Sequence, residues 1–421
     1  MTKFFRTVIK SNKLLLLMAL LSYVIICLLT PNTGFIADLN CWRMWSEQMR
    51  MSGPAIAYHS GVNYLPLYIY FLYIYSLLQV SIQGIADHLI FLKYITLIFD
   101  VAGALLIVSF VRNNKMQLLF FLCLIFNIAF LYNNIIWGQV DAIHTTLLAA
   151  ALYFVIKKQI TASSILYTLA ICMKFQAIIY LPAFAILWLP LLLQNFKPQT
   201  IFSILGINLL IIFTLFSPFI YDSGFSYTIN YVINMIATHS NVISKSAFNF
   251  WELMVDGALF NISDEEPFWG MTYKIWGTLF SILFLLASLI PLFKISFQSK
   301  KQGNLEKNLS HIFLSFSLTT LVFFYFKTGM HERYAHSALL FMAGYAFLSH
   351  DFIPYILNSL AYFFQLNTVM TYSKYDSHMN FMVNQDLTSV LFLITIGYSF
   401  YKLYARGKHA PINKYSIPNQ G

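Results

Sequence analysis

The run Leu14–Leu29, LLLLMALLSYVIICLL, decides the fold class because it is apolar throughout and contains no charged residue. It approaches the ~20 apolar residues that an α-helix needs to cross a bilayer. Comparable runs occupy 275–292 and 387–401, and the chain of 421 residues is 59% hydrophobic, 18% aromatic and only 10% charged. A soluble protein cannot bury so much apolar surface. The sequence therefore predicts an all-α polytopic membrane protein, without the alternating segments of an outer-membrane barrel.

The charged and sulfur-containing residues exclude several other classes. Lys3, Arg6, Lys10 and Lys13 precede the first run and no small-residue cleavage site follows it, so we interpret it as a retained helix. The net charge of +10 reflects basic residues at the ends of apolar segments, which indicates membrane orientation and not nucleic-acid binding. The four cysteines show neither a metal-binding spacing nor a disulfide framework.

Hydropathy predicts about twelve spanning segments in a single domain, residues 1–421. They are 13–30, 89–110, 116–132, 142–157, 161–174, 176–193, 200–217, 274–296, 309–326, 335–350, 352–368 and 387–404. The apolar, tyrosine-rich stretch 63–79 is left out, because counting it would move the basic loops at 112–115 and 157–158 to the outside. We expect 63–79 to be re-entrant or interfacial, both termini to be cytoplasmic, and the outer loops to be 31–88, 132–141 and 218–273.

Polar clusters fall on the predicted outer side. Asp38 precedes Trp42 and Trp45 by four and seven residues, which places all three on one helix face. Three further clusters lie at segment ends, and a fourth in the loop 218–273: Trp137-Gly138-Gln139-Val140-Asp141, Lys174-Phe175-Gln176, Met330-His331-Glu332-Arg333-Tyr334, and Ser246-Ala247-Phe248-Asn249-Phe250-Trp251.

Each cluster has an ordinary structural explanation. Tryptophans anchor interfacial helices, Asp141 is a good helix cap, and a row of polar residues is a common solvated turn. A lysine at the depth of Lys174, however, is costly without a partner. Arg333 and His331 suit a phosphate, and the aromatic loop suits a sugar. Together, on one face, they indicate a site for an anionic lipid and a sugar.

In this order the motifs resemble the membrane-embedded glycosyltransferases of the GT-C superfamily, specifically bacterial relatives of the second mannosyltransferase of GPI-anchor synthesis. The resemblance covers most of the chain. It rests on Asp38 with Trp42, on Tyr64-x-Pro66-Leu67-Tyr68, and on the motifs that begin at Trp137, Lys174, Ala247 and Met330. It implies a GT-C-like fold with membrane-parallel helices in the first outer loop, in a bacterial inner membrane.

The resemblance also implies the chemistry. A sugar, mannose or another hexose, would pass from a polyprenyl-phosphate donor to a glycolipid or polysaccharide acceptor at the outer face, with inversion and without a required metal or other cofactor. Asp38 would be the general base, and His331, Arg333 and Lys174 would bind the donor phosphate. The remaining candidates for substrate or acceptor contacts are Trp42, Tyr64, Gln139, Asp141, Asn249, Trp251 and Glu332.

Two other functions use the same kind of chain. A flippase or exporter of lipid-linked oligosaccharides needs polar groups through the midplane, and Asp100 is one acid at that depth, paired with Lys93 or hydrogen-bonded within the bundle. An O-antigen polymerase or ligase would have arginines in a large outer loop, whereas 218–273 contains none.

Overall fold

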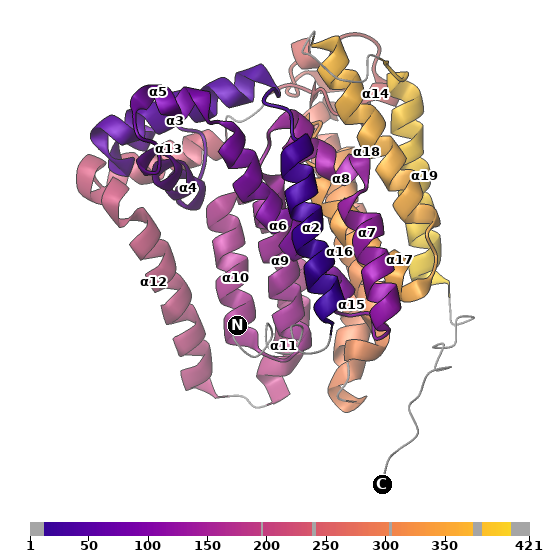
Figure 1. Cartoon of the computed structure of the whole chain (residues 1–421). Coiled ribbons are helices and arrows are strands. Elements are labelled where there is room, and N and C mark those ends of the chain that lie inside the picture. The colour runs from indigo at the N-terminus through magenta and orange to yellow at the C-terminus, as the bar shows by residue number, and fades with distance from the viewer. Residues whose placement is uncertain (1–11, 195–196, 238–240, 303–304, 374–380, 406–421) are drawn as a thin grey trace.

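Long helices stand side by side in the computed structural model, which describes residues 12–194, 197–237, 241–302, 305–373 and 381–405 (Figure 1). Each of them lies over one of the predicted apolar segments. They are α2 (Lys13–Leu29), α6 (Ile90–Val108), α7 (Asn114–Ile125), α9 (Asp141–Ile156), α10 (Ile160–Met173), α11 (Leu181–Gln194), α12 (Pro198–Ser223), α15 (Tyr273–Gln302), α16 (Leu309–Phe326), α17 (His336–Ser349), α18 (Ile353–Tyr372) and α19 (Gln385–Tyr404).

Several of these helices can cross a bilayer on length and composition alone. Among the described residues six helical stretches qualify: Ile90–Val108, Phe175–Gln194, Pro198–Ser223, Tyr273–Gln298, Leu305–Phe326 and Gln385–Tyr404. The bent pair Asn114–Ile125 and Ile128–Trp137 makes a seventh if it is one span. Five further apolar helices have 10–17 residues: α2, α9, α10, α17 and the short α4 (Pro66–Leu77). The prediction of an all-α membrane protein is therefore confirmed, whereas twelve crossings stay a prediction.

The predicted helix 116–132 is interrupted. α7 ends at Ile125, and the chain bends by 55° before α8 (Ile128–Leu131) and the π-helical η2 (Tyr132–Trp137). Asn127 causes the break, because its side-chain oxygen caps the backbone N–H groups of Ala129 and Phe130. The expected outer loop 132–141 is thus mostly helical.

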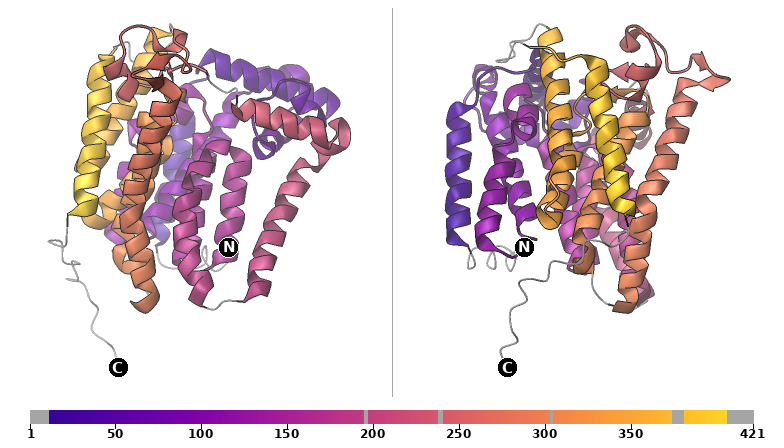
Figure 2. Two further views of the ribbon diagram at one scale, coloured as in Figure 1. Left: turned by 180° about the vertical axis from the view of Figure 1, so that it is seen from behind. Right: turned by 90° about the vertical axis from the view of Figure 1, so that its right-hand side faces the viewer.

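Short helices form a cap at one end of the bundle. They are α3 (Ile36–Ser52), η1 (Pro54–Tyr58), α4 (Pro66–Leu77), α5 (Ile82–Asp87) and α13 (Phe225–Ala237), and they lie across the upright helices (Figures 1 and 2). α4 covers most of 63–79, but its 12 residues reach only ~18 Å. A bilayer core is ~30 Å thick. α4 lies in the cap, and that 63–79 does not span stays a prediction.

The centre of the bundle is the pair α16 and α17. Within the apolar helical stretch that contains α16, 78% of the residues are buried. In α17 nearly every side chain from His336 to Phe347 is buried. Gly344 lets the two helices approach closely, because a Cβ at this position would lie 2.7 Å from the Phe313 ring. This buried pair holds the start of α17, and so the residues just before it, in a fixed place.

The third outer loop begins later than predicted. α12 continues through Pro218 to Ser223, so six residues expected in the loop extend the helix. Beyond α13 the chain forms a small outer segment. Its elements are β1 (Ser244–Lys245), α14 (Phe250–Met254), η4 (Leu259–Asn261), β2 (Pro267–Phe268) and β3 (Met271–Thr272). β2 and β3 are antiparallel, while β1 pairs in parallel with β4 (Met330–His331).

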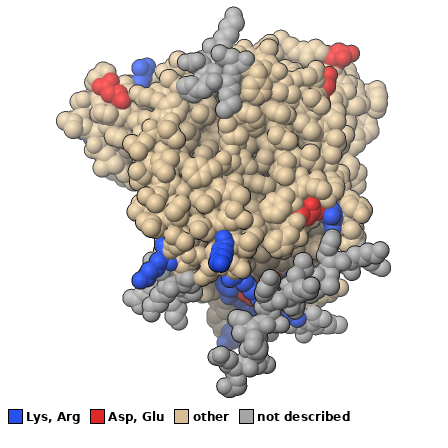
Figure 3. Space-filling model, turned by 45° about the vertical axis from the view of Figure 1, so that its right-hand side comes forward, with Lys and Arg blue, Asp and Glu red and all other residues tan. Residues whose placement is uncertain are grey.

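The two ends of the bundle differ in charge. Blue Lys and Arg side chains gather at the end away from the cap (Figure 3). Exposed basic residues in the turns there include Arg112, Lys115, Lys157, Lys158 and Lys197. η3 (Phe175–Tyr180), which leads into α11 at the opposite end, follows Lys174, and η5 (Leu305–Asn308) precedes α16. The bundle therefore has one basic end and one end that carries the cap and the outer segment.

Candidate functional site

Asp38 lies in the first turn of α3, and the turn between η2 and α9 fixes its carboxylate. Trp137 Nε1 donates to Oδ2 over 2.8 Å, and Gln139 Nε2 donates to the same oxygen over 2.5 Å. Oδ1 accepts no hydrogen bond from any residue that the structure describes. One carboxylate oxygen is therefore held in place while the other keeps its lone pairs for a different partner.

Backbone contacts bring these two segments together. The Phe35 N–H donates to the Trp137 carbonyl over 2.8 Å, and the two rings stack with centroids 4.6 Å apart. Gly34 is needed here because a Cβ would lie 2.8 Å from the same carbonyl. Gly138 adopts φ +93°, a left-handed conformation that favours glycine. The geometry thus explains why glycine occupies position 34, before Asp38, and position 138, after Trp137.

An aromatic group supports this turn from the other side. Trp42 Nε1 donates to the Gly138 carbonyl over 3.2 Å, and the Tyr64 hydroxyl donates to Gln139 Oε1 over 3.4 Å. The Trp42 and Tyr64 rings meet edge to face at 5.2 Å. Asp38, Trp42 and Trp45 do share one helix face, as predicted. That face points into the protein, so Trp42 and Trp45 are buried and do not anchor α3 in lipid headgroups.

Asp141 and Lys174 form a nearly buried ion pair. Lys174 caps the C-terminus of α10, and its Nζ contacts Asp141 Oδ1 at the start of α9, with side-chain exposures of 11% and 1%. Asn133 donates to the other carboxylate oxygen over 3.1 Å. Nζ also lies 5.2 Å from the centre of the Tyr334 ring. Lys174 thus has the partner that its depth requires.

Glu332 and Arg333 form a second buried pair in the turn before α17. Arg333 Nη1 donates to Glu332 Oε1 over 2.6 Å, and His331 Nδ1 lies 3.6 Å from Oε2. Burial opposes ionisation of Glu332, but Arg333 and then His331 outweigh it and lower the pKa to about 2. Burial and the nearby Arg333 charge lower the pKa of His331, which favours a neutral imidazole.

The two pairs and Asp38 belong to one cluster. Burial alone would lower the pKa of Arg333, but the Asp38 and Glu332 carboxylates raise it well above its usual value. Lys174 lies within electrostatic range of both Asp38 and Arg333. The structure therefore gathers Asp38, Tyr64, Gln139, Asp141, Lys174, Glu332 and Arg333, with His331 beside them. A carboxylate within electrostatic range of two cations is suited to a ligand that contains both an anion and a hydroxyl.

Two members of this neighbourhood gave no sequence signal. Lys245 lies opposite His331 in the β1–β4 pair, and burial together with the Arg333 charge lowers its pKa. Gln365 of α18 accepts the Phe248 N–H over 2.8 Å and donates to the Glu332 carbonyl. Neither residue belongs to a motif. Both reach the site through the packing of segments that are distant in the chain, which the sequence alone does not reveal.

Asn249 and Trp251 are not brought to the cluster, contrary to the expectation that they contact substrate. Both are fully buried. Asn249 caps α14 and donates to the Phe324 carbonyl over 3.2 Å, while Trp251 Nε1 donates to the Phe326 carbonyl over 2.9 Å. Their polar atoms fasten the outer segment to the end of α16, so we assign both residues to the fold.

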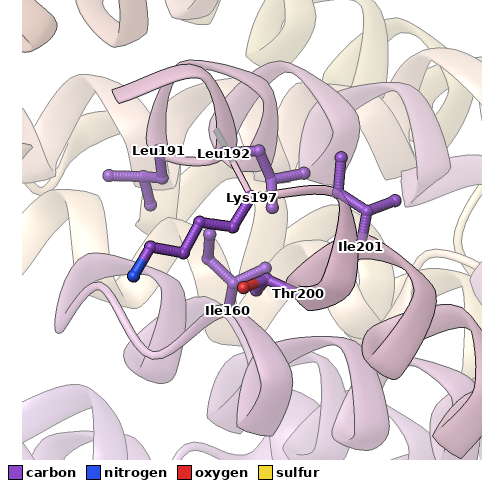
Figure 4. A pocket seen from close by; sticks show the side chains of 6 residues that line it. All are labelled: Ile160, Leu191, Leu192, Lys197, Thr200 and Ile201. Atoms are coloured by element: carbon purple, nitrogen blue, oxygen red, sulfur yellow. The ribbon is translucent and has the colours of Figure 1, made fainter. Parts of the chain in front are cut away.

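Two further features bear on ligands. Among the described residues no group of three or more His, Cys, Asp and Glu side chains is arranged to hold a metal ion. A hollow of about 460 Å³ lies at the basic end, between α10, α11 and α12 (Figure 4). Lys197 and Thr200 line it among four aliphatic side chains, and no residue of the cluster takes part.

Fold and site together define an all-α membrane protein with a charged cluster beneath its cap. No protein-family model matches the chain, and no curated protein matches its sequence.

Proposed function

We propose that this protein is a membrane-embedded glycosyltransferase of the GT-C type. It transfers a hexose, such as mannose, from a polyprenyl-phosphate-sugar donor to a glycolipid or polysaccharide acceptor. The observation that carries the proposal is the Asp38 carboxylate, with Oδ2 held by Trp137 and Gln139 and Oδ1 unbonded within the described residues. It lies in the field of Arg333 and Lys174.

Asp38 acts as the general base. An acceptor hydroxyl gives its proton to Oδ1 while its oxygen bonds to the anomeric carbon of the sugar. The bond from that carbon to the phosphate oxygen breaks, and its electron pair leaves with the phosphate. Attack opposite the leaving group inverts the configuration. A positioned base of this kind contributes a factor of about 10²–10⁴ in rate.

The cations balance the charge that develops on the leaving phosphate. Arg333 and Lys174 are held in place by Glu332 and Asp141, so little reorganisation is needed when the donor binds. His331 supplies a further hydrogen-bond donor beside Arg333. A polyprenyl monophosphate carries less charge than a pyrophosphate, and two cations suit it without a metal ion.

The membrane orientation follows from charge. We infer twelve crossings, with the basic end in the cytoplasm and the cap and cluster at the outer, periplasmic side of a bacterial inner membrane. The residues at both termini, which we expect to be cytoplasmic, lie outside the described part of the chain. A donor in the outer leaflet would then meet the cluster at the level of its phosphate.

Transport is less well supported. A flippase requires polar groups along a path through the midplane. Asp100 is such a group, but it accepts a hydrogen bond from Asn134 over 2.9 Å within the packed bundle. Hydrogen bonding within the bundle, one of the structural explanations of Asp100 given above, accounts for one of its two carboxylate oxygens.

The test is a transfer assay with purified protein in lipid nanodiscs. Defined polyprenyl-phosphate hexoses and an extract of glycolipid acceptors are supplied, and mass spectrometry follows both lipid pools. We expect loss of one donor, gain of one hexose on an acceptor, and a fall of about 10²-fold or more in Asp38→Asn. The control is Asp222→Asn, an exposed acid at the same end. Full turnover by Asp38→Asn, or no donor consumed by the native protein, would refute the proposal.

A further inference from the structure

Lys93 is a buried lysine on α6 that is not part of the charged cluster. Its side chain is in the core, with 3% of the residue exposed. Nζ donates to three backbone carbonyls, those of Pro31 over 3.1 Å, Thr33 over 2.5 Å and Ile135 over 2.6 Å. An ammonium group has three protons and no acceptor atom, so these carbonyls satisfy it completely. The carbonyls come from two chain segments about a hundred residues apart.

One segment leads along the chain to Asp38, and the other leads to the two residues that donate hydrogen bonds to its carboxylate. Pro31 and Thr33 precede α3, and Ile135 lies two residues before Trp137. Asn134 strengthens the second attachment, because its side chain donates to the Lys93 carbonyl over 3.2 Å and to Asp100 over 2.9 Å. α6 therefore holds the turn that donates to the Asp38 carboxylate, and it also holds the loop that carries Asp38.

We propose that Lys93 is a positioning residue for Asp38, a role that rests on the proposed function of Asp38 as a base. The ammonium fixes the entry of α3 against the turn 135–139. It thereby keeps Oδ2 on Trp137 and Gln139 and turns Oδ1 toward the acceptor. Buried charge-assisted hydrogen bonds are stronger than neutral ones, which suits a junction that must not drift. A misplacement of about 1 Å costs on the order of 10²-fold in rate.

If Lys93 were purely structural, its replacement would lower stability without an effect through Asp38. Two measurements distinguish this structural role from the positioning role. The variant is Lys93→Met, which keeps the aliphatic stem and removes all three donors. The control is Thr96→Val, one turn along α6 and also buried, whose hydroxyl donates only to the carbonyl of Leu92 in its own helix. Both are measured in the full chain in nanodiscs, with and without Asp38→Asn.

Amide hydrogen exchange is the first measurement. In Lys93→Met, peptides covering 31–37 and 132–139 should exchange at least about ten-fold faster, because the first segment loses two charge-assisted hydrogen bonds and the second loses one. Thr96→Val should match the native protein. Native exchange in Lys93→Met would overturn the proposal.

Turnover is the second measurement. In the native background kcat should fall by about 10²-fold with little change in the donor KM. In the Asp38→Asn background Lys93→Met should cost nothing further, whereas an equal loss in both backgrounds would overturn the proposal. Full activity of Asp38→Asn would instead refute the base assignment, and the exchange data would still decide whether Lys93 holds the loops. Lys93→Gln is used if Lys93→Met does not fold; failure of both to fold would assign Lys93 to assembly and overturn the positioning role.

Discussion

Glu332 and Arg333 are neighbours in the chain and also ion partners, joined over 2.6 Å with side-chain exposures of only 5% and 12%. Side chains of adjacent residues usually point apart, so the tight turn before α17 is what allows the pair to form. The pair is attached to α18 as well, because Tyr362 donates to the Arg333 carbonyl over 3.2 Å. It is therefore both a support of the fold and a candidate part of the phosphate site.

Loss of Glu332 should destabilise the protein. Glu332→Gln removes the carboxylate that Arg333 contacts and leaves only the more distant Asp38 charge, and breaking such a pair costs about 3–5 kcal/mol. Thermal unfolding in nanodiscs at pH 7 measures the effect. The matched control is Glu306→Gln, which breaks a half-exposed pair with Lys157 and should cost less than about 1 kcal/mol. Equal effects of the two variants would contradict the buried role of Glu332.

Low pH should remove the contribution of Glu332 to the stability of the folded protein. The pKa of Glu332 is lowered from its ordinary value of 4.5 to about 2 in the folded protein. The stabilisation is therefore complete above about pH 4.5 and is lost as the pH falls toward 2. Unfolding midpoints of the native protein and Glu332→Gln should converge over this interval. A constant difference between them down to pH 2 would exclude Glu332 as the titrating group.

Lys174 and Asp141 should show strong coupling. Lys174→Met and Asp141→Asn each leave one buried charge alone, so each should lower the unfolding midpoint more than the neutral double variant does. If Lys174 binds the donor phosphate, the double variant should still raise the donor KM by about ten-fold to a hundred-fold, the range of a charge-assisted hydrogen bond. An unchanged donor KM in a stable double variant would remove Lys174 from the phosphate site.

Asp38→Glu distinguishes positioning from basicity. The longer side chain keeps the carboxylate but shifts it by about 1 Å, so we expect little recovery of activity over Asp38→Asn. Binding of the donor should survive in both variants. Thermal stability should change little because Asp38 is half-buried and forms no ion pair with any residue that the structure describes. Near-native turnover of Asp38→Glu would show that the position of the carboxylate is not critical.

Membrane orientation can be tested by labelling single cysteines in a background without the four native ones. A cysteine at Asn113, in the exposed turn between α6 and α7, should react only after the membrane is permeabilised. A cysteine at Asp222, at the end of α12, should react from the outside. Reaction of the Asn113 variant from the periplasm would reverse the proposed orientation.

The sequence by itself determined the helices and the end of the bundle where each motif lies. Long apolar runs have few alternatives in a bilayer, because their backbone groups must be satisfied within the helix. Basic turns also separate the two ends, so Asp38, Asp141, Lys174 and Arg333 could be assigned to one face without coordinates. Local signals such as the cap at Asn127 were present too, although hydropathy alone did not reveal the break there.

Only the tertiary structure decided which polar atoms meet. Trp42, Asn249 and Trp251 look like surface aromatic and amide residues in the sequence, yet packing buries them and directs their N–H groups to backbone carbonyls. Lys93, Lys245 and Gln365 belong to no motif, yet each reaches the site or its supports from a distant segment. Hydropathy reports the surroundings of a residue along its own helix. The partner of a buried donor depends on how helices pack, and that is a property of the whole bundle.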